Sequence, residues 1–156
     1  MGLDSHIYKK KILTDNWALA AENDIKHRML VEETEVLYLR KANQIHRYIV
    51  NKFNHGIDDQ TEIPLEIDDI KELMEICSKI MSKCRRGARI TNKRFAKKLL
   101  PTKRGYFFGS TDYGRYYWDC VESFWKQAIE IIEDYNREIE KGTSDLDLRY
   151  YYIASW

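Results

Sequence analysis

The sequence contains few of the features that mark a secreted or a metal-binding protein. Its 156 residues include only three cysteines, an odd number, and no Cys-x-x-Cys pair. Cys77 and Cys84 would lie two turns apart on a predicted helix, roughly 10 Å along its axis, which is beyond the reach of a disulfide. We therefore interpret the cysteines as small buried hydrophobic residues of a protein in a reducing compartment.

Long apolar segments and familiar catalytic motifs are also missing. No apolar run approaches the roughly 18 residues that a membrane span needs, and the N-terminus has no apolar signal region. We therefore expect a cytoplasmic protein without a membrane partner. The chain has no HExxH, GxSxG or GxGxxG pattern and no zinc-spaced Cys/His cluster. The carboxylate pairs Asp58-Asp59 and Asp68-Asp69 lie where acidic residues are common, so we expect neither a metal site nor a cofactor.

Neither sign of charge dominates, because 26 Lys and Arg residues face 25 Asp and Glu residues and the formal net charge is only +1. The distribution is uneven, since residues 76–111 contain eleven Lys and Arg residues and no Asp or Glu. This segment is either a solvated surface, balanced by the acidic stretches on either side, or a surface that contacts phosphate groups. Its part Lys83–Arg104 could make sequence-independent contacts with nucleic acid, although it lacks the spaced aromatic residues of a stacking platform.

The residues that are present predict a single domain that covers residues 1–156. Hydrophobic residues make up 44% of the chain and charged residues 33%, which is enough for a core and a hydrated surface. Within this domain the basic segment 83–104 is a candidate mobile insertion. Strands are predicted at Ser5–Leu13, Arg28–Val36 and Leu146–Trp156. A polar stretch with some helical tendency, residues 14–26, separates the first two strands.

Apolar residues at helical spacing predict three long helices, and a short basic helix follows the second of them. Their predicted ranges are Leu37–Phe53, Ile67–Cys84, a short helix within residues 91–100, and Asp112–Lys141. Only two prolines interrupt the chain. The sequence therefore predicts an α+β fold, with a small antiparallel sheet of about three strands packed on about three helices.

The most informative residue of the first helix is His46. At 100° per residue it falls inside the apolar side of the helix, near Ala42 and Phe53. Asn43 lies one turn earlier and Arg40 one turn before that, so the three residues would form a polar ridge that enters the core. A buried imidazole needs hydrogen-bond partners, and these partners belong either to the protein, as in a structural histidine, or to a ligand.

A second candidate site is the segment Leu99–Thr111, in which two glycines flank three aromatic residues and two hydroxyl residues precede a predicted helix. A helix N-terminus presents free N–H groups and a positive dipole end. Gly109, Ser110 and Thr111 could therefore hold a phosphate or a carboxylate, with Lys103 adding charge. Ordinary helix capping explains the two hydroxyl residues equally well.

These segments resemble a family of tailed-phage proteins. The family has a Met-Gly-Leu-Asp start, an Arg-Lys-Ala-Asn-x-Ile-His stretch, a Leu-Leu-Pro-Thr-x-x-Gly-(aromatic)-Phe-Phe-Gly-Ser-Thr-x-Tyr block and a Tyr-Tyr-x-x-Ser-Trp ending. The matching segments here are residues 1–4, Arg40–His46, Leu99–Tyr113 and Tyr151–Trp156. The resemblance is spread over nearly the whole chain and implies phage origin and a shared fold, without implying a particular reaction.

We therefore expect a phage accessory protein, active in host takeover or against host defence, that binds a nucleotide-like phosphorylated ligand or a host protein. In the ligand hypothesis, Tyr106 or Trp156 stacks on a base. The complete set of predicted ligand-binding residues is Arg40, Asn43, His46, Thr102, Gly109, Ser110, Thr111 and Trp156. One alternative is a small enzyme that uses His46 as a general acid or base, and a second is a nucleic-acid-associated protein. A homo-oligomer is a default expectation.

Overall fold

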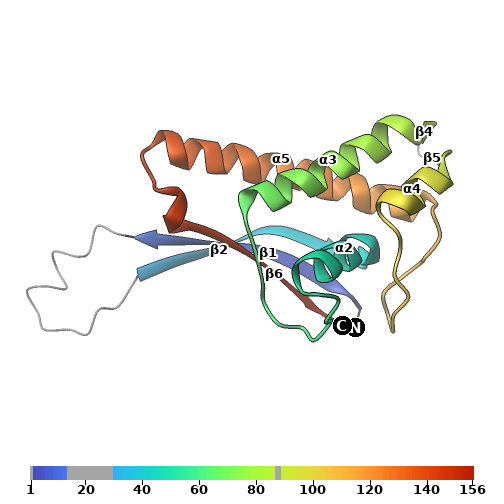
Figure 1. Cartoon of the computed structure of the whole chain (residues 1–156), viewed down its shortest axis with the longest axis horizontal. Coiled ribbons are helices and arrows are strands. Elements are labelled where there is room, and N and C mark those ends of the chain that lie inside the picture. The colour runs from blue at the N-terminus through green and yellow to red at the C-terminus, as the bar shows by residue number, and fades with distance from the viewer. Residues whose placement is uncertain (1, 14–29, 87–88) are drawn as a thin grey trace, which may run out of the picture.

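The computed structural model describes residues 2–13, 30–86 and 89–156, which form an α+β architecture (Figure 1). The predicted fold class is therefore confirmed. The strands of the main sheet, in spatial order, are β2 (Leu30–Arg40), β1 (Asp4–Leu13), β6 (Leu148–Ser155) and β3 (Ile63–Leu65). Neighbouring strands are antiparallel. The described sheet has one strand more than predicted, because the three residues of β3 are too few to produce an alternating pattern.

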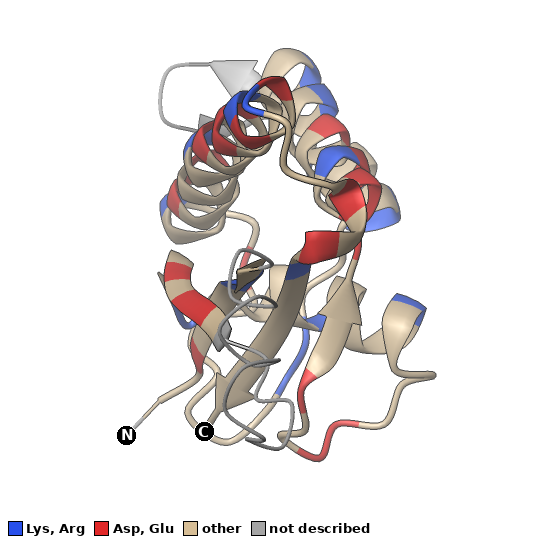
Figure 2. Ribbon diagram, turned by 90° about the vertical axis from the view of Figure 1, so that its left-hand side faces the viewer, with Lys and Arg blue, Asp and Glu red and all other residues tan. Residues whose placement is uncertain are grey.

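The helices lie mainly on one side of this sheet. Those within the described ranges are α2 (Asn43–Phe53), α3 (Ile67–Lys83), α4 (Lys93–Leu99) and α5 (Arg115–Glu140), with a 3-10 turn η2 (Asp145–Asp147) before β6 and a small hairpin of β4 (Arg85–Arg86) and β5 (Arg89–Ile90). The long helices α3 and α5 pack together above the sheet, as Figures 1 and 2 show. The predicted polar stretch 14–26 lies outside the described residues. Within the described part of the chain, every helix is too short or too polar to traverse a lipid bilayer.

One β-bulge decides which residues of the β1–β2 hairpin face the helices. Ile7 pairs with Leu37, whereas the next residue, Tyr8, pairs with Glu35, so Val36 is an extra residue in β2. Side chains alternate along a strand, and an extra residue reverses that alternation relative to the partner strand. Leu37 therefore faces the core with Ile7, while Glu35 lies with Tyr8 on the opposite face.

The end of β2 corrects the predicted helix Leu37–Phe53. Leu37 and Leu39 are buried, and the residue after each of them is exposed, which is the two-residue period of a strand. Leu39 also lies at helical spacing from later apolar residues, so a short apolar stretch of this kind fits either period. Pairing with β1 decides in favour of the strand, and the helix begins only at Asn43.

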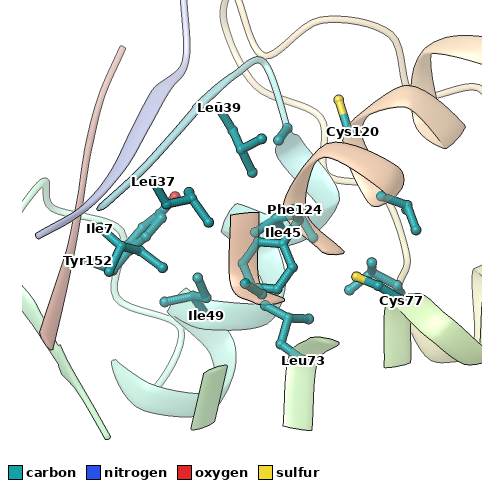
Figure 3. Packing of buried hydrophobic residues seen from close by; sticks show 14 of the residues in the cluster. Ile7, Leu37, Leu39, Ile45, Ile49, Leu73, Cys77, Cys120, Phe124 and Tyr152 are labelled. Carbon is teal, nitrogen blue, oxygen red and sulfur yellow. The ribbon is translucent and has the colours of Figure 1, made fainter. Parts of the chain in front are cut away.

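The core lies between the sheet and the helices. Phe124 of α5, Ile45 of α2 and Leu73 of α3 are at most 2% exposed and meet near its centre (Figure 3). The cysteines are free and buried, as predicted, and burial raises the pKa of the Cys120 thiol to about 11. The basic segment 83–104 takes part in this core, because its apolar residues Cys84, Ala96 and Leu100 have no exposed surface.

Two lysines of β1 extend the contact between the sheet and α5 beyond the apolar core. Lys9 lies 2.5 Å from Asp134 and Lys11 lies 2.6 Å from Glu138, both on α5. The hydrogen bond from Lys11, together with one from Thr143, holds the pKa of Glu138 below its ordinary value. At the end of β1 that is farther from α2, ion pairs therefore take the place of apolar packing.

We predict that removal of the hydroxyl group has opposite effects on stability for two tyrosines that project from the same face of β6. The Tyr150 hydroxyl is buried without a hydrogen-bond partner in the described structure, whereas the Tyr152 hydroxyl lies close to two polar groups. Tyr150→Phe should raise the free energy of unfolding by about 1 kcal/mol, and Tyr152→Phe should lower it by about 1–2 kcal/mol. Urea unfolding of both variants measures the difference, and equal effects would contradict the assignment.

Candidate functional site

A buried histidine on α2 is the centre of a polar network that joins this helix to the sheet. His46 is 1% exposed. Its Nδ1 atom lies 2.8 Å from the Tyr152 hydroxyl on β6, which lies 2.9 Å from Ser5 Oγ on β1. Its Nε2 atom lies 3.0 Å from both carboxylate oxygens of Asp58, in the loop between α2 and β3. The predicted burial of His46 is confirmed.

The start of α2 places this histidine against the side of the sheet that faces the core. Lys41 has a positive φ of 55°, which turns the chain out of β2, and its N–H donates to the Leu3 carbonyl at 2.5 Å. The first four residues of the helix are all buried although three of them are polar. Each polar side chain has protein partners, as Gln44 illustrates by donating to the Tyr117 carbonyl at 3.2 Å. The beginning of α2 is therefore a polar insertion into an apolar core.

Burial sets the protonation of His46. It lowers the pKa of the imidazole from its ordinary value, and the hydrogen bond to Asp58 opposes this shift without cancelling it. A neutral imidazole has one N–H donor and one acceptor nitrogen. The carboxylate of Asp58 only accepts, so Nε2 carries the hydrogen and Nδ1 accepts from the Tyr152 hydroxyl. Both ring nitrogens are thus occupied by protein groups.

Asp58 connects the histidine to a second segment of the chain. Its carboxylate pairs with the Lys103 ammonium as well as with His46. Both members of this ion pair are mostly shielded from solvent, with side-chain exposures of 18% for Asp58 and 28% for Lys103. The pair fastens the segment after α4 to the loop that follows α2.

Residues 101–113, here named the aromatic loop, are held by two further side chains of α2. Asn43 donates to the carbonyls of Phe108 at 3.0 Å and Ser110 at 2.9 Å, and its own carbonyl accepts from the Lys103 N–H at 3.1 Å. Arg47 donates to the Thr102 carbonyl at 2.7 Å. One side of the helix therefore fixes the backbone at both ends of the loop.

The aromatic loop buries one ring and exposes two. Phe108 is 3% exposed and lies edge-on to His46, with ring centroids 5.4 Å apart, and to Trp156 at 5.7 Å. Tyr106 and Phe107, by contrast, are 81% and 48% exposed. Phe108 thus anchors the loop in the network, and its two neighbours project from the surface.

The structure brings together six of the eight predicted ligand-binding residues in pairs that are in direct contact. Asn43 contacts Ser110, Thr102 Oγ1 donates to the Thr111 carbonyl at 3.0 Å, and His46 packs against Trp156 at a centroid distance of 5.5 Å. The contacts of Ser110 and Thr111 with this network use their backbone carbonyls. These residues therefore shape the loop through carbonyl oxygens, which accept hydrogen bonds and are not groups that bind an anion.

Arg40 does not belong to the predicted polar ridge. It is the last residue of β2, its side chain is 60% exposed, and its Nε atom lies 4.0 Å from Asp4. A ridge at positions i, i+3 and i+6 requires one continuous helix, and the turn at Lys41 separates Arg40 from α2. The ridge is therefore corrected to Asn43 and His46, with Arg47 as an additional member.

The expected anion cradle at a helix start is also corrected. Helix α5 begins at Arg115, with Gly114 as the N-cap, and not near Asp112 as predicted. The Gly109-Ser110-Thr111 segment therefore lies at least four residues before the helix. Ser110 Oγ accepts a local hydrogen bond from the Asp112 N–H at 3.1 Å. The free N–H groups of α5 consequently do not come from the Gly-Ser-Thr segment.

The space beside His46 is small. A cleft lined by Val50, Asp58, Tyr152 and Trp156 has a volume of only about 10 Å³, whereas sites for small molecules usually occupy roughly 300–1,000 Å³. The geometry near His46 is therefore that of a tightly closed polar network.

Sequence reasoning missed Asp58 and Tyr152 as members of this network. Asp58 was visible as part of an acidic pair after the turn at Gly56, and a buried histidine twelve residues earlier is the signal that could have selected it. Tyr152 lies 106 residues from His46, and only the pairing of β6 with β1 brings it there.

Comparison with family models, curated proteins and solved structures finds no match for the chain. Within the described ranges, no group of three or more His, Cys, Asp and Glu side chains is arranged to hold a metal ion. The geometry of the described side chains is therefore the basis for interpreting the site.

We predict that His46 makes stability depend on pH. The folded-state pKa is lower than the ordinary value of 6.5, so the unfolded chain takes up its proton first as the pH falls. The contribution of His46 is complete above pH 6.5 and decreases as the pH falls below it, by at most about 1.4 kcal/mol per pH unit. Urea unfolding between pH 7.5 and 5.5 should show this decrease in the wild type and a smaller one in His46→Gln.

The matched control for this measurement is His55→Gln, which removes an exposed histidine. It should keep the wild-type decrease in stability between pH 7.5 and 5.5. An unchanged decrease in His46→Gln would show that other groups cause the pH dependence.

We also predict that Asn43 fixes the aromatic loop. Asn43→Ala removes three hydrogen bonds to the loop and should lower the free energy of unfolding by about 2 kcal/mol. Hydrogen exchange of the Lys103 amide should become at least about tenfold faster. Asn51→Ala, which changes an exposed residue of the same helix, should leave both values unchanged, and an equal effect of the two substitutions would contradict the prediction.

Proposed function

We propose that this chain is a phage accessory protein, active in host takeover or against host defence, that binds a host protein through the tip of the aromatic loop. The observation that carries the proposal is the exposure of Tyr106 and Phe107 on a loop whose backbone is held by hydrogen bonds from side chains of α2. The phage origin rests on the resemblance of segments such as Arg40–His46 and Leu99–Tyr113.

The loop has the properties of a prepared binding element. Tyr106 and Phe107 meet edge to face with ring centroids 4.6 Å apart, and exposed aromatic residues are typical of the few positions that dominate protein interfaces. Their backbone needs little further ordering, because Asn43, Arg47 and Lys103 already hold it. A rigid loop loses less conformational entropy on binding, which favours affinity.

The backbone of Phe107 supports a functional reason for its side chain. Its φ of 62° lies in the left-handed region, which costs a residue with a side chain about 1 kcal/mol or more and which glycine adopts freely. An exposed ring at such a position is not explained by folding. A phenylalanine at this strained, exposed position favours a role in binding.

Charges around the tip indicate the kind of partner. Lys41 packs against Gly109 beneath the loop, and Arg40 and Phe107 both lie near Gly2. Arg104 is exposed two residues before the tip. We therefore propose a host protein that offers an apolar pocket with acidic residues around it.

The geometry favours this version over a nucleotide-like ligand or an enzyme. Catalysis by His46 needs a ring nitrogen that faces a substrate, and both nitrogens are bonded to Asp58 and Tyr152. The adjacent cleft is also smaller than ordinary ligand sites. Both considerations support a structural role for the network and a binding role for the loop.

A sharp test separates folding from binding at one residue. Phe107→Gly relieves the strained backbone while removing the exposed ring, so the free energy of unfolding should stay unchanged or rise by up to about 1 kcal/mol. Binding should nevertheless weaken at least about tenfold. The measurement is quantitative mass spectrometry of proteins captured from infected cells, followed by titration of the purified partner.

The control is Leu146→Ser, which removes an apolar residue that is even more exposed than Phe107 and lies near the far end of the sheet, and it should keep wild-type binding. A partner that binds Phe107→Gly as tightly as the wild type would overturn the proposal. Captured nucleic acid, lost on replacing Lys97 and Lys98 on α4 by serine, would instead favour the nucleic-acid alternative.

A further inference from the structure

A groove far from the aromatic loop has a volume of about 820 Å³. It lies between β3, the first turn of α3, the end of α5, η2 and the start of β6. In Figure 1 the end of α5, η2 and the start of β6 lie at the left of the molecule. A volume of this size suits a small molecule.

A buried hydroxyl without a partner lines this groove. Tyr150 is 3% exposed, and its Oη atom has no hydrogen bond within the described structure. Buried hydroxyl groups are nearly always paired, so an unpaired one needs an explanation. Tyr150 lines the groove together with Tyr135 and Asp145, so a molecule in the groove is the candidate for the missing partner.

Acidic residues dominate the charged part of the lining. Four carboxylates line the groove, against two cations, and these six residues are Glu66, Asp68, Asp69, Asp145, Lys71 and Arg149. Two tyrosine rings and several aliphatic side chains complete the lining. Carboxylates together with aromatic rings are the surroundings that attract an organic cation.

The groove already contains one example of this recognition. The Lys71 ammonium lies 5.8 Å from the centroid of the Tyr135 ring and 2.9 Å from Asp68. The Tyr135 hydroxyl donates to Asp145 at 2.7 Å, which directs the ring and the carboxylate to the same region. An alkylammonium group is thus held by an aromatic ring and a carboxylate in the protein itself.

Anions and metal ions fit the groove less well. Asp69 at the start of α3 accepts from the Glu66 N–H at 2.8 Å, so carboxylates already occupy the end of the helix where an anion would bind. No group of acidic, histidine or cysteine side chains in the described ranges is arranged for a metal ion. An organic cation with several N–H donors and an aliphatic body fits both the acidic and the apolar parts of the lining.

We propose that this groove binds a small aliphatic polyamine. One ammonium group donates to the Tyr150 hydroxyl and another lies between Asp145 and Asp68, while the methylene chain rests on the tyrosine rings. The site is separate from the aromatic loop, and neither proposal depends on the other.

Isothermal titration calorimetry of the whole protein with spermidine tests the proposal. We expect one binding site in the wild type and an affinity at least about tenfold lower in Tyr150→Phe, because a hydrogen bond to a charged group is lost. Asp145→Asn should weaken binding to a similar degree. Spermidine should also raise the melting temperature of the wild type more than that of either variant.

Matched substitutions control for general charge effects. Tyr106→Phe and Asp119→Asn change a hydroxyl and a carboxylate that do not line the groove, and both should keep wild-type affinity. Equal affinity of Tyr150→Phe and the wild type would overturn the proposal, as would displacement of spermidine by magnesium chloride at equal ionic strength. If a lysine-rich peptide bound the groove and spermidine did not, the polyamine proposal would be wrong and the occupant would be a protein segment.

Discussion

The hydrogen bonds of the buried His46 imidazole are the interaction on which the arrangement of this protein depends. A neutral imidazole inside an apolar core must use both ring nitrogens, and the protein supplies Asp58 on one side and Tyr152 on the other. Tyr152 ties α2 to the central strands, and Asp58 passes the connection to Lys103. A single side chain thereby links the sheet, the helix and the aromatic loop.

The proposed working surfaces lie outside this network, which gives them a rigid base. Asn43 holds the aromatic loop so that Phe108 is buried and Phe107 is exposed. At the other end of the sheet, ion pairs replace apolar packing, and a groove opens between the strands and the long helices. Separation of the two surfaces allows binding at one of them without a change at the other.

Much of the fold was predictable because its signals are local. The range of α3 follows from apolar residues at helical spacing, and the end of α5 follows from Gly142, whose φ of 92° ends the helix. The end of β2 was not predictable, because Leu39 fits both a strand and a helix. The start of α5 was misplaced for a similar reason, since Ser110 and Asp112 bond to each other in a loop and mimic a helix cap.

The α+β class and the burial of His46 followed from the sequence alone, because hydrophobic periodicity and turn residues act over a few positions. Only the tertiary structure decided the partners of His46, since Asp58 and Tyr152 are brought to it by a loop and by strand pairing. It also decided that the Tyr150 hydroxyl has no hydrogen-bond partner among the described residues. Hydrogen bonds between distant segments depend on how strands and helices are placed together, and one sequence read along the chain does not specify that placement.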